Sequence, residues 1–162
     1  MLKRLWTHFL MTRWHLRGAF PPHVLQAVEQ AITTAEKSHG GEIRFVVERE
    51  FDIGQLLSDV TPRQRAIQLF GQEGVWDTAD NNGVLIYVSL ADRDVEIVAD
   101  RGFESRVTDA QWAEVCRTME HSFRHRAFER GALEGIEGVS KLIATHYPSA
   151  DGNELPNQAL IL

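Results

Sequence analysis

Two short polar segments of the sequence carry side chains that could bind a metal ion. Asp80, Asn81 and Asn82 precede a long apolar run, while Asp100 and Glu104 follow the next apolar segment. Carboxylate and amide oxygens are hard ligands, which Ca²⁺ and Mg²⁺ prefer to nitrogen or sulfur. If the two segments meet in the fold, these five residues are predicted to form a site for a divalent cation.

Arginines beside the second segment extend the possible chemistry to phosphate esters. In a metal-assisted phosphatase, Asp80 and Asp100 would hold the ion, while Arg101 or Arg106 would orient the phosphate group. The candidate catalytic residues are therefore Asp80, Asp100 and Arg101. No neighbouring residue is a convincing general base, so we rank hydrolysis below simple cation binding and leave open whether the protein is an enzyme.

The same residues have a simpler structural explanation. Asp, Asn and Gly all accept the left-handed conformations that tight loops require, so residues 80–83 also fit an ordinary turn. Asp92, Arg93 and Asp94 lie between two apolar segments and have the polar character of a solvated hairpin turn. Seven strand residues would separate the two groups of acids by roughly 23 Å, so they cannot share one ion.

A β-hairpin is the element that must bring the two polar segments together. Residues 83–90 form a nearly continuous apolar run, as expected for a central strand that is covered on both faces. Residues 94–99 alternate between apolar and polar side chains, which predicts a second strand after a short turn. The start of one hairpin strand lies beside the end of the other, so residues 80–82 and 100–104 should be neighbours.

The remaining elements predict the layers around this hairpin. Residues 42–47 alternate like a strand with one apolar face, and residues 128–146 have the apolar spacing of a helix. Further helices should follow Pro22, Thr61 and Thr108, the last two through their capping-box spacing. The predicted fold is therefore α/β: a single-layer mixed sheet with a βαβ crossover and an antiparallel hairpin, flanked by helices on both faces.

Charge is distributed unevenly along the chain. The 162 residues fit one domain with a formal net charge of −6, yet residues 1–20 contain four basic residues and no acid. Subtracting those four positive charges leaves −10 for the rest of the chain. Such an acidic body disfavours nucleic acid as a partner, because phosphate contacts need clustered Lys and Arg. It favours cations.

The ends of the chain are predicted to lie outside the domain formed by residues 21–148. Residues 1–20 are a basic amphipathic segment, and its charges interrupt the run of about 20 mainly apolar residues that spanning a bilayer would need. Residues 2–17 either rest on an anionic membrane surface or, as we favour, pack on the domain or fray. We predict a cytoplasmic protein, with peripheral contact to the inner membrane as the alternative. Residues 149–162 are predicted to be a flexible tail.

Several parts of the sequence together resemble the TPM domain. The family takes its name from thylakoid lumen phosphatase-like proteins, photosystem repair proteins and a modulator of acetylcholine receptors. The likeness extends over residues 41–146, and its motifs are residues 82–89 (NGVLIYVS), 92–97 (DRDVEI), 102–104 (GFE), 107–109 (VTD) and the pattern of residues 123–136.

The resemblance implies a mixed sheet with flanking helices. It does not imply one activity, because the family includes proteins described as acid phosphatases, calcium binders and bacterial members without a settled role. The acidic charge of the chain and its cluster of oxygen ligands favour an accessory binding domain. The expected function is to bind a divalent cation and a protein or membrane-associated partner, with metal-assisted acid phosphatase as the alternative. The family's functional motif falls on Asp80, Asn81, Asn82, Gly102 and Glu104.

This sequence also departs from the family pattern at two places. Asp100 and Arg101 precede Gly102 where many members have glycine and an aromatic residue, and Arg126 occupies a position that glycine often holds. Each departure places a charged side chain where many members have none. Usual members are also exported or membrane-tethered, whereas this sequence has no convincing export signal, so we expect its site and its compartment to differ from those of the family.

Overall fold

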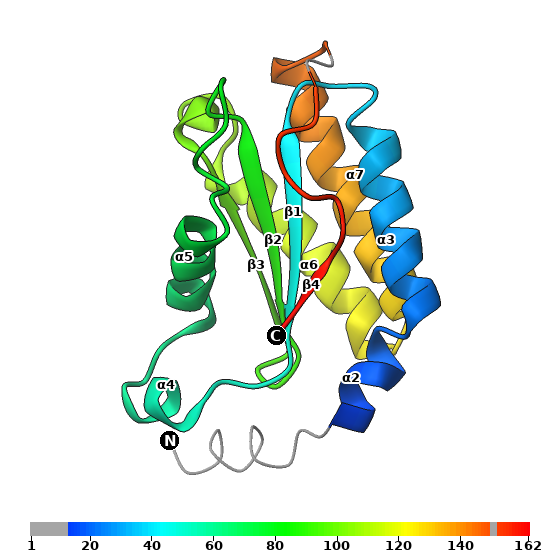
Figure 1. The fold of residues 1–162 in the computed structure, drawn as a ribbon, viewed down its shortest axis with the longest axis vertical. Helices are drawn as coiled ribbons and strands as arrows, with labels where there is room; N and C mark the ends of the chain where they lie inside the picture. Colours follow the sequence, from blue (N-terminus) through cyan, green and yellow to red (C-terminus); the bar gives the residue numbers. More distant parts are fainter. Residues whose placement is uncertain (1–12, 150–151) are drawn as a thin grey trace.

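A four-stranded mixed sheet forms the centre of the protein (Figure 1). The structure is a computed structural model, and it describes residues 13–149 and 152–162. The strand order is β3-β2-β1-β4, with bounds β1 (Glu42–Glu48), β2 (Gly83–Ser89), β3 (Asp94–Ala99) and β4 (Leu160–Ile161). Helices pack against both faces, so the predicted α/β fold class is confirmed.

The crossover and the hairpin fix the order of the three long strands. β1 and β2 are parallel, and Glu42 lies opposite Gly83. The connection between them contains α4 (Ile53–Leu57) and α5 (Pro62–Gln72). β2 and β3 are antiparallel, with Val84 opposite Ala99, so the residues that precede β2 and those that follow β3 lie at one end of the sheet.

Two predicted helix starts agree with the structure because local hydrogen bonds determine them. The Thr61 and Thr108 side chains accept hydrogen bonds from the backbone N–H groups of Gln64 and Gln111, and each glutamine side chain accepts one in return. α5 therefore begins at Pro62, and α6 (Asp109–Arg124) begins directly after Thr108.

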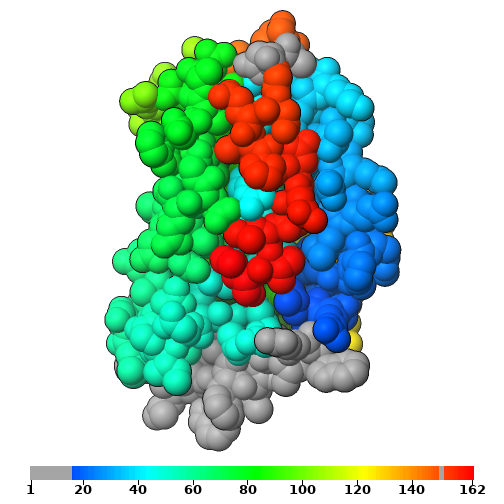
Figure 2. All heavy atoms as spheres, in the orientation of Figure 1, coloured from blue at the N-terminus to red at the C-terminus, as the bar shows by residue number. Residues whose placement is uncertain are grey.

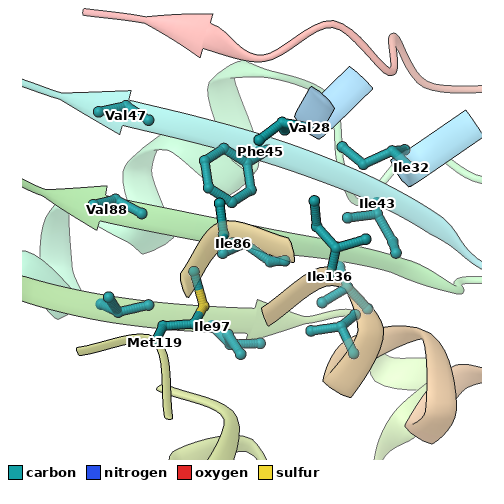
Figure 3. Close-up of a cluster of buried hydrophobic side chains, with 14 of the residues drawn as sticks. Val28, Ile32, Ile43, Phe45, Val47, Ile86, Val88, Ile97, Met119 and Ile136 are labelled. Atoms are coloured by element: carbon teal, nitrogen blue, oxygen red, sulfur yellow. The ribbon is translucent and has the colours of Figure 1, made fainter. Parts of the chain in front are cut away.

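The larger core lies between the sheet and three helices. These helices are α3 (Pro22–Ala35), α6 and α7 (Phe128–His146). Figure 3 shows Phe45 and Ile86 of neighbouring strands on the same face of the sheet, with Ile136 of α7 among the side chains packed there. Every second residue of β1 and β2 faces this core, as strand geometry requires.

The opposite face of the sheet packs against α5 and contains a buried ionic cluster. Ala66 and Leu69 of α5 are buried among residues of the three long strands. Glu48, at the end of β1, is only 4 % exposed. Its carboxylate accepts hydrogen bonds from Arg65 of α5 at 2.8 and 3.0 Å and from the Tyr87 hydroxyl of β2 at 2.6 Å. This cluster joins two strands and a helix through one buried charge.

Residues 152–162, the part of the predicted tail that the structure describes, form an extended strap along the edge of β1. Figure 2 shows this C-terminal strap on the surface between the segment that contains α5 and the α3 side of the molecule. The Arg44 Nη1 atom donates hydrogen bonds to the carbonyls of Pro156, at 3.1 Å, and Gln158, at 2.6 Å. The strap ends in β4, which pairs in parallel with Val46 and Val47.

The basic N-terminal segment lies mostly outside the described residues. The proposed membrane contact involves residues 2–17, of which the structure describes only the backbone that enters α2 (Arg13–Ala19) and the side chains from residue 16 onward. None of the helices in residues 13–149 has the combination of length and apolar character that crossing a membrane requires.

Candidate functional site

The hairpin brings the two predicted polar segments side by side. The backbone N–H of Asp100 donates to the carbonyl of Gly83 at 2.9 Å, and the N–H of Gly102 donates to the carbonyl of Asn81 at 3.0 Å. Residues 101–103 form a short 3₁₀ turn directly after β3. We call residues 80–82 and 100–104, together with the groups that contact them, the hairpin-end site.

Asn81 and Arg101 bind each other across this site. The Nε atom of Arg101 donates to the Oδ1 atom of Asn81 at 2.7 Å. Asn81 has a positive φ of 54°, a conformation that asparagine accepts more readily than most residues. The ordinary-turn explanation of residues 80–83 therefore accounts for the backbone of Asn81, while its side-chain oxygen already has a protein partner.

Asn82 is fully buried and connects the hairpin to the neighbouring loop. Its Nδ2 group donates to the carbonyl of Gly40, and its backbone N–H donates to the Thr78 hydroxyl at 3.1 Å. Its Oδ1 atom is buried without a hydrogen-bond partner among the described residues. Leaving a buried acceptor unsatisfied costs about 1–3 kcal/mol, so this oxygen needs a ligand or a water molecule.

Asp100 also has a buried side-chain oxygen without a hydrogen-bond partner among the described residues. Its Oδ1 atom accepts a hydrogen bond from the backbone N–H of Arg101 at 2.7 Å, which caps the 3₁₀ turn. Its Oδ2 atom is buried and, within residues 13–149 and 152–162, has no hydrogen-bond partner. Asp100 and Asn82 thus each offer one buried oxygen at the end of the hairpin.

Tyr147 belongs to the hairpin-end site, although the sequence analysis did not identify it. It follows the last residue of α7, and its hydroxyl donates to the carbonyl of Asp80 at 3.4 Å. The Arg106 guanidinium lies 5.3 Å from the centre of its ring. Burial raises the pKa of Tyr147; the nearby Arg106 lowers this pKa, and Asp80 and Asp100 raise it. The phenol is therefore a protonated donor at neutral pH.

Gly102 makes room for the contact between Tyr147 and the hairpin, which gives a testable prediction. A Cβ atom at residue 102 would lie 2.3 Å from both the Asn81 carbonyl oxygen and the Tyr147 hydroxyl oxygen. We expect Gly102→Ala to lower the free energy of unfolding by about 2 kcal/mol, because backbone as well as side chain must shift. Urea denaturation measures the effect.

Gly71→Ala is the matched control for this substitution. Gly71 lies near the end of α5, and no atom lies within 4 Å of the position that its Cβ would occupy. Alanine has a higher helix propensity than glycine, so this variant should be as stable as the wild type or slightly more stable. Equal losses in the two variants would contradict the close packing at Gly102.

The structure does not gather all five predicted metal ligands. Glu104 is exposed, and its backbone N–H donates to the carbonyl of Arg101 at 3.0 Å. Residues 13–149 and 152–162 contain no group of three His, Cys, Asp or Glu side chains arranged to hold a metal ion. Any cation here must therefore use amide, carbonyl or water oxygens in addition to carboxylates.

Comparison with known proteins identifies the family. The sequence matches the TPM domain over residues 16–142. BA42 from the psychrophilic bacterium Bizionia argentinensis is 30% identical, with a TM-score of 0.75 over 86% of this chain and 93% of BA42. The N-terminal domain of a P. gingivalis protein is 21% identical, with a TM-score of 0.60 over 77% of this chain and 76% of that domain. No curated protein matches. The family match extends over more than half of the sequence, and the protein belongs to the TPM domain family.

Proposed function

We propose that this protein is an accessory binding domain that holds Ca²⁺ or Mg²⁺ at the hairpin-end site and contacts a protein or membrane-associated partner there. The observation that carries the proposal is the pair of buried oxygens, Asn82 Oδ1 and Asp100 Oδ2, that have no partner among the described residues. Both oxygens are of the kind that these ions prefer. A bound cation would satisfy them and offset the cost of their burial.

Other oxygens of the site can complete the ligand set. The Asp80 carbonyl already accepts a long hydrogen bond from Tyr147, and the Asp80 side chain is exposed. Ca²⁺ binds six to eight oxygens in flexible geometry and commonly retains water, so it tolerates a site with few carboxylates. The net charge of −6 further favours a cation.

Metal-assisted hydrolysis of phosphate esters is the alternative, supported by the two arginines beside the site. Arg101 donates to Asn81, and Arg106 lies over the ring of Tyr147, so both guanidinium groups could contact an anion near a bound ion. Hydrolysis also needs a general base. Tyr147 is protonated at neutral pH because its pKa is raised, so it does not supply one. We therefore rank binding above hydrolysis.

Calorimetry with Ca²⁺ and Mg²⁺ tests the proposal. We expect the wild type to release or absorb heat with one of these ions and to melt at a higher temperature in its presence. Ion at 100 times its Kd would add about 2.7 kcal/mol of stability. Asp100→Asn keeps an oxygen that can cap the 3₁₀ turn but removes the negative charge, so it should weaken ion binding at least tenfold.

Asp109→Asn is the matched control. Asp109 is an exposed residue in the first turn of α6, outside the hairpin-end site, so this variant should bind the ion like the wild type. Absence of both heat and a melting shift at millimolar ion would refute the cation proposal. Hydrolysis of a generic phosphate ester that depends on both the ion and Asp100 would favour the phosphatase instead.

A further inference from the structure

A pocket lies at the end of the sheet opposite the hairpin-end site. Its volume is about 820 Å³, within the range typical of small-molecule sites. Figure 1 shows that β1 and β2 point towards the end of the molecule where α2 lies, and the pocket is formed there between α2, the end of β2, the β2–β3 turn and the junction of α6 with α7. Sheets with parallel strands commonly bind ligands beyond the carboxyl ends of these strands.

The charged side chains that line the pocket have a net charge of +1. Its lining contains Arg93, Arg124, Arg126, Asp94 and Glu120. Arg124 and Glu120 form an ion pair at 2.9 Å. Within the part of the chain that the structure describes, Arg93 and Arg126 have no ion pair or side-chain hydrogen bond. Two guanidinium groups are thus available to an anion.

The backbone at these two arginines has a conformation that favours glycine. Arg93 and Arg126 have positive φ angles of 57° and 59°. Glycine adopts this left-handed conformation without strain, whereas a residue with a Cβ atom does so at a cost in stability. Among the described residues, neither guanidinium has an ion pair or side-chain hydrogen bond that would explain an arginine at these positions, which is consistent with a ligand-binding role.

One wall of the pocket is apolar. The Phe123 and Phe128 rings stack with their centres 5.5 Å apart, and both residues line the pocket. Val88 and Leu90 add aliphatic surface at the end of β2. A ligand in this pocket would therefore contact charged groups on one side and aromatic carbon on the other.

We propose that this pocket binds an amphiphilic monocarboxylate, with its carboxylate on Arg93 and Arg126 and its apolar part against Phe123 and Phe128. A single negative charge neutralises the net +1 of the lining. A phosphate ester, with a charge near −2, would leave an excess negative charge beside Asp94 and Glu120. This site is separate from the proposed cation site and does not depend on it.

Titration with octanoate, 1-octanol and n-octyl phosphate tests the proposal. The three probes share an apolar chain and differ in their head group, and binding is measured by calorimetry on the full chain. We expect octanoate to bind at least tenfold more tightly than either other probe. Equal binding of octanol would show a purely apolar pocket, and tighter binding of octyl phosphate would show a phosphate site; either result overturns the carboxylate proposal.

The variants Arg126→Gly and Arg93→Gly test whether these two arginines bind the carboxylate, and neither substitution should destabilise the fold. Glycine fits the positive φ at both positions, so each variant should melt at or above the wild-type temperature. Each should nevertheless lose at least tenfold in octanoate affinity. Ser105→Gly is the matched control, because Ser105 has a φ of 61° and does not line the pocket. Undiminished octanoate binding by both arginine variants, or no binding by the wild type, overturns the proposal.

Discussion

Replacing Arg65 by methionine should lower the free energy of unfolding by about 3–5 kcal/mol, because it leaves the buried carboxylate of Glu48 without its counter-ion. Glu48 is 4 % exposed, and Arg65 holds it through several hydrogen bonds, the shortest 2.8 Å long. The other partner, Tyr87, cannot replace the lost charge. Burial and the neighbouring Glu48 raise the pKa of Tyr87, so its hydroxyl remains a neutral donor. Equilibrium unfolding in urea measures the effect.

Two further variants test whether the loss of stability comes from the uncompensated buried charge or simply from the loss of an ion pair. Arg117→Met removes an ion pair with Glu114 in which both side chains are more than half exposed, and it should cost less than about 1 kcal/mol. The double variant Glu48→Gln, Arg65→Met removes the buried charge altogether and should recover much of the loss. If Arg65→Met were no more harmful than Arg117→Met, the Glu48 carboxylate would not depend on Arg65.

The central strand and the hairpin were predictable because local sequence determines them. Residues 83–90 are apolar almost without interruption, and β2 is buried along its whole length. Thr61 and Thr108 bond to groups only three residues away, so their spacing alone located two helix starts.

The first strand was only partly predictable, because its polar residues have partners far away in the sequence. Alternation at residues 42–47 predicted a strand with one apolar face, yet every residue of β1 is buried. Glu42 accepts a hydrogen bond from the backbone N–H of Leu155, and Arg44 bonds to two carbonyls of the C-terminal strap. These contacts cross more than 100 residues, and no periodic pattern reveals them.

Similar reasons limit what the sequence reveals about the site. Hairpin geometry correctly placed residues 80–82 beside residues 100–102, since pairing of neighbouring strands is a local property. It could not indicate that Arg101 would occupy the side-chain oxygen of Asn81, because that depends on rotamers. Tyr147 reaches the site from the end of α7, 67 residues after Asp80, and no motif in the sequence marks it.

The buried Glu36 should make stability depend on pH. Glu36 follows α3 and is 8 % exposed. One carboxyl oxygen accepts a hydrogen bond from the Ile43 backbone N–H at 3.0 Å, whereas the other is buried without a partner among the described residues. Burial raises the pKa of Glu36 to about 7, the hydrogen bond from the Ile43 backbone and the nearby Asn157 side chain lower this pKa, and the negative charge of Glu42 raises it.

The direction of the pH effect follows from this raised pKa. Between about pH 4.5 and pH 7 the folded protein holds a proton on Glu36 that the unfolded chain releases, so the contribution of Glu36 to stability falls as the pH rises. The Glu36→Gln side chain stays neutral at every pH. The unfolding free energy of this variant should exceed that of the wild type by about 3 kcal/mol at pH 8, and this difference should shrink to well under 1 kcal/mol near pH 4.5.

Comparing each variant with the wild type at the same pH cancels the titrating groups that do not interact with Glu36, including Asp94, whose pKa burial raises to about 6. Glu29→Gln is the matched control, since Glu29 is exposed on the same helix and its replacement should change the stability little. A difference between Glu36→Gln and wild type that stays constant from pH 4.5 to pH 8 would mean that Glu36 titrates alike in the folded and unfolded chains.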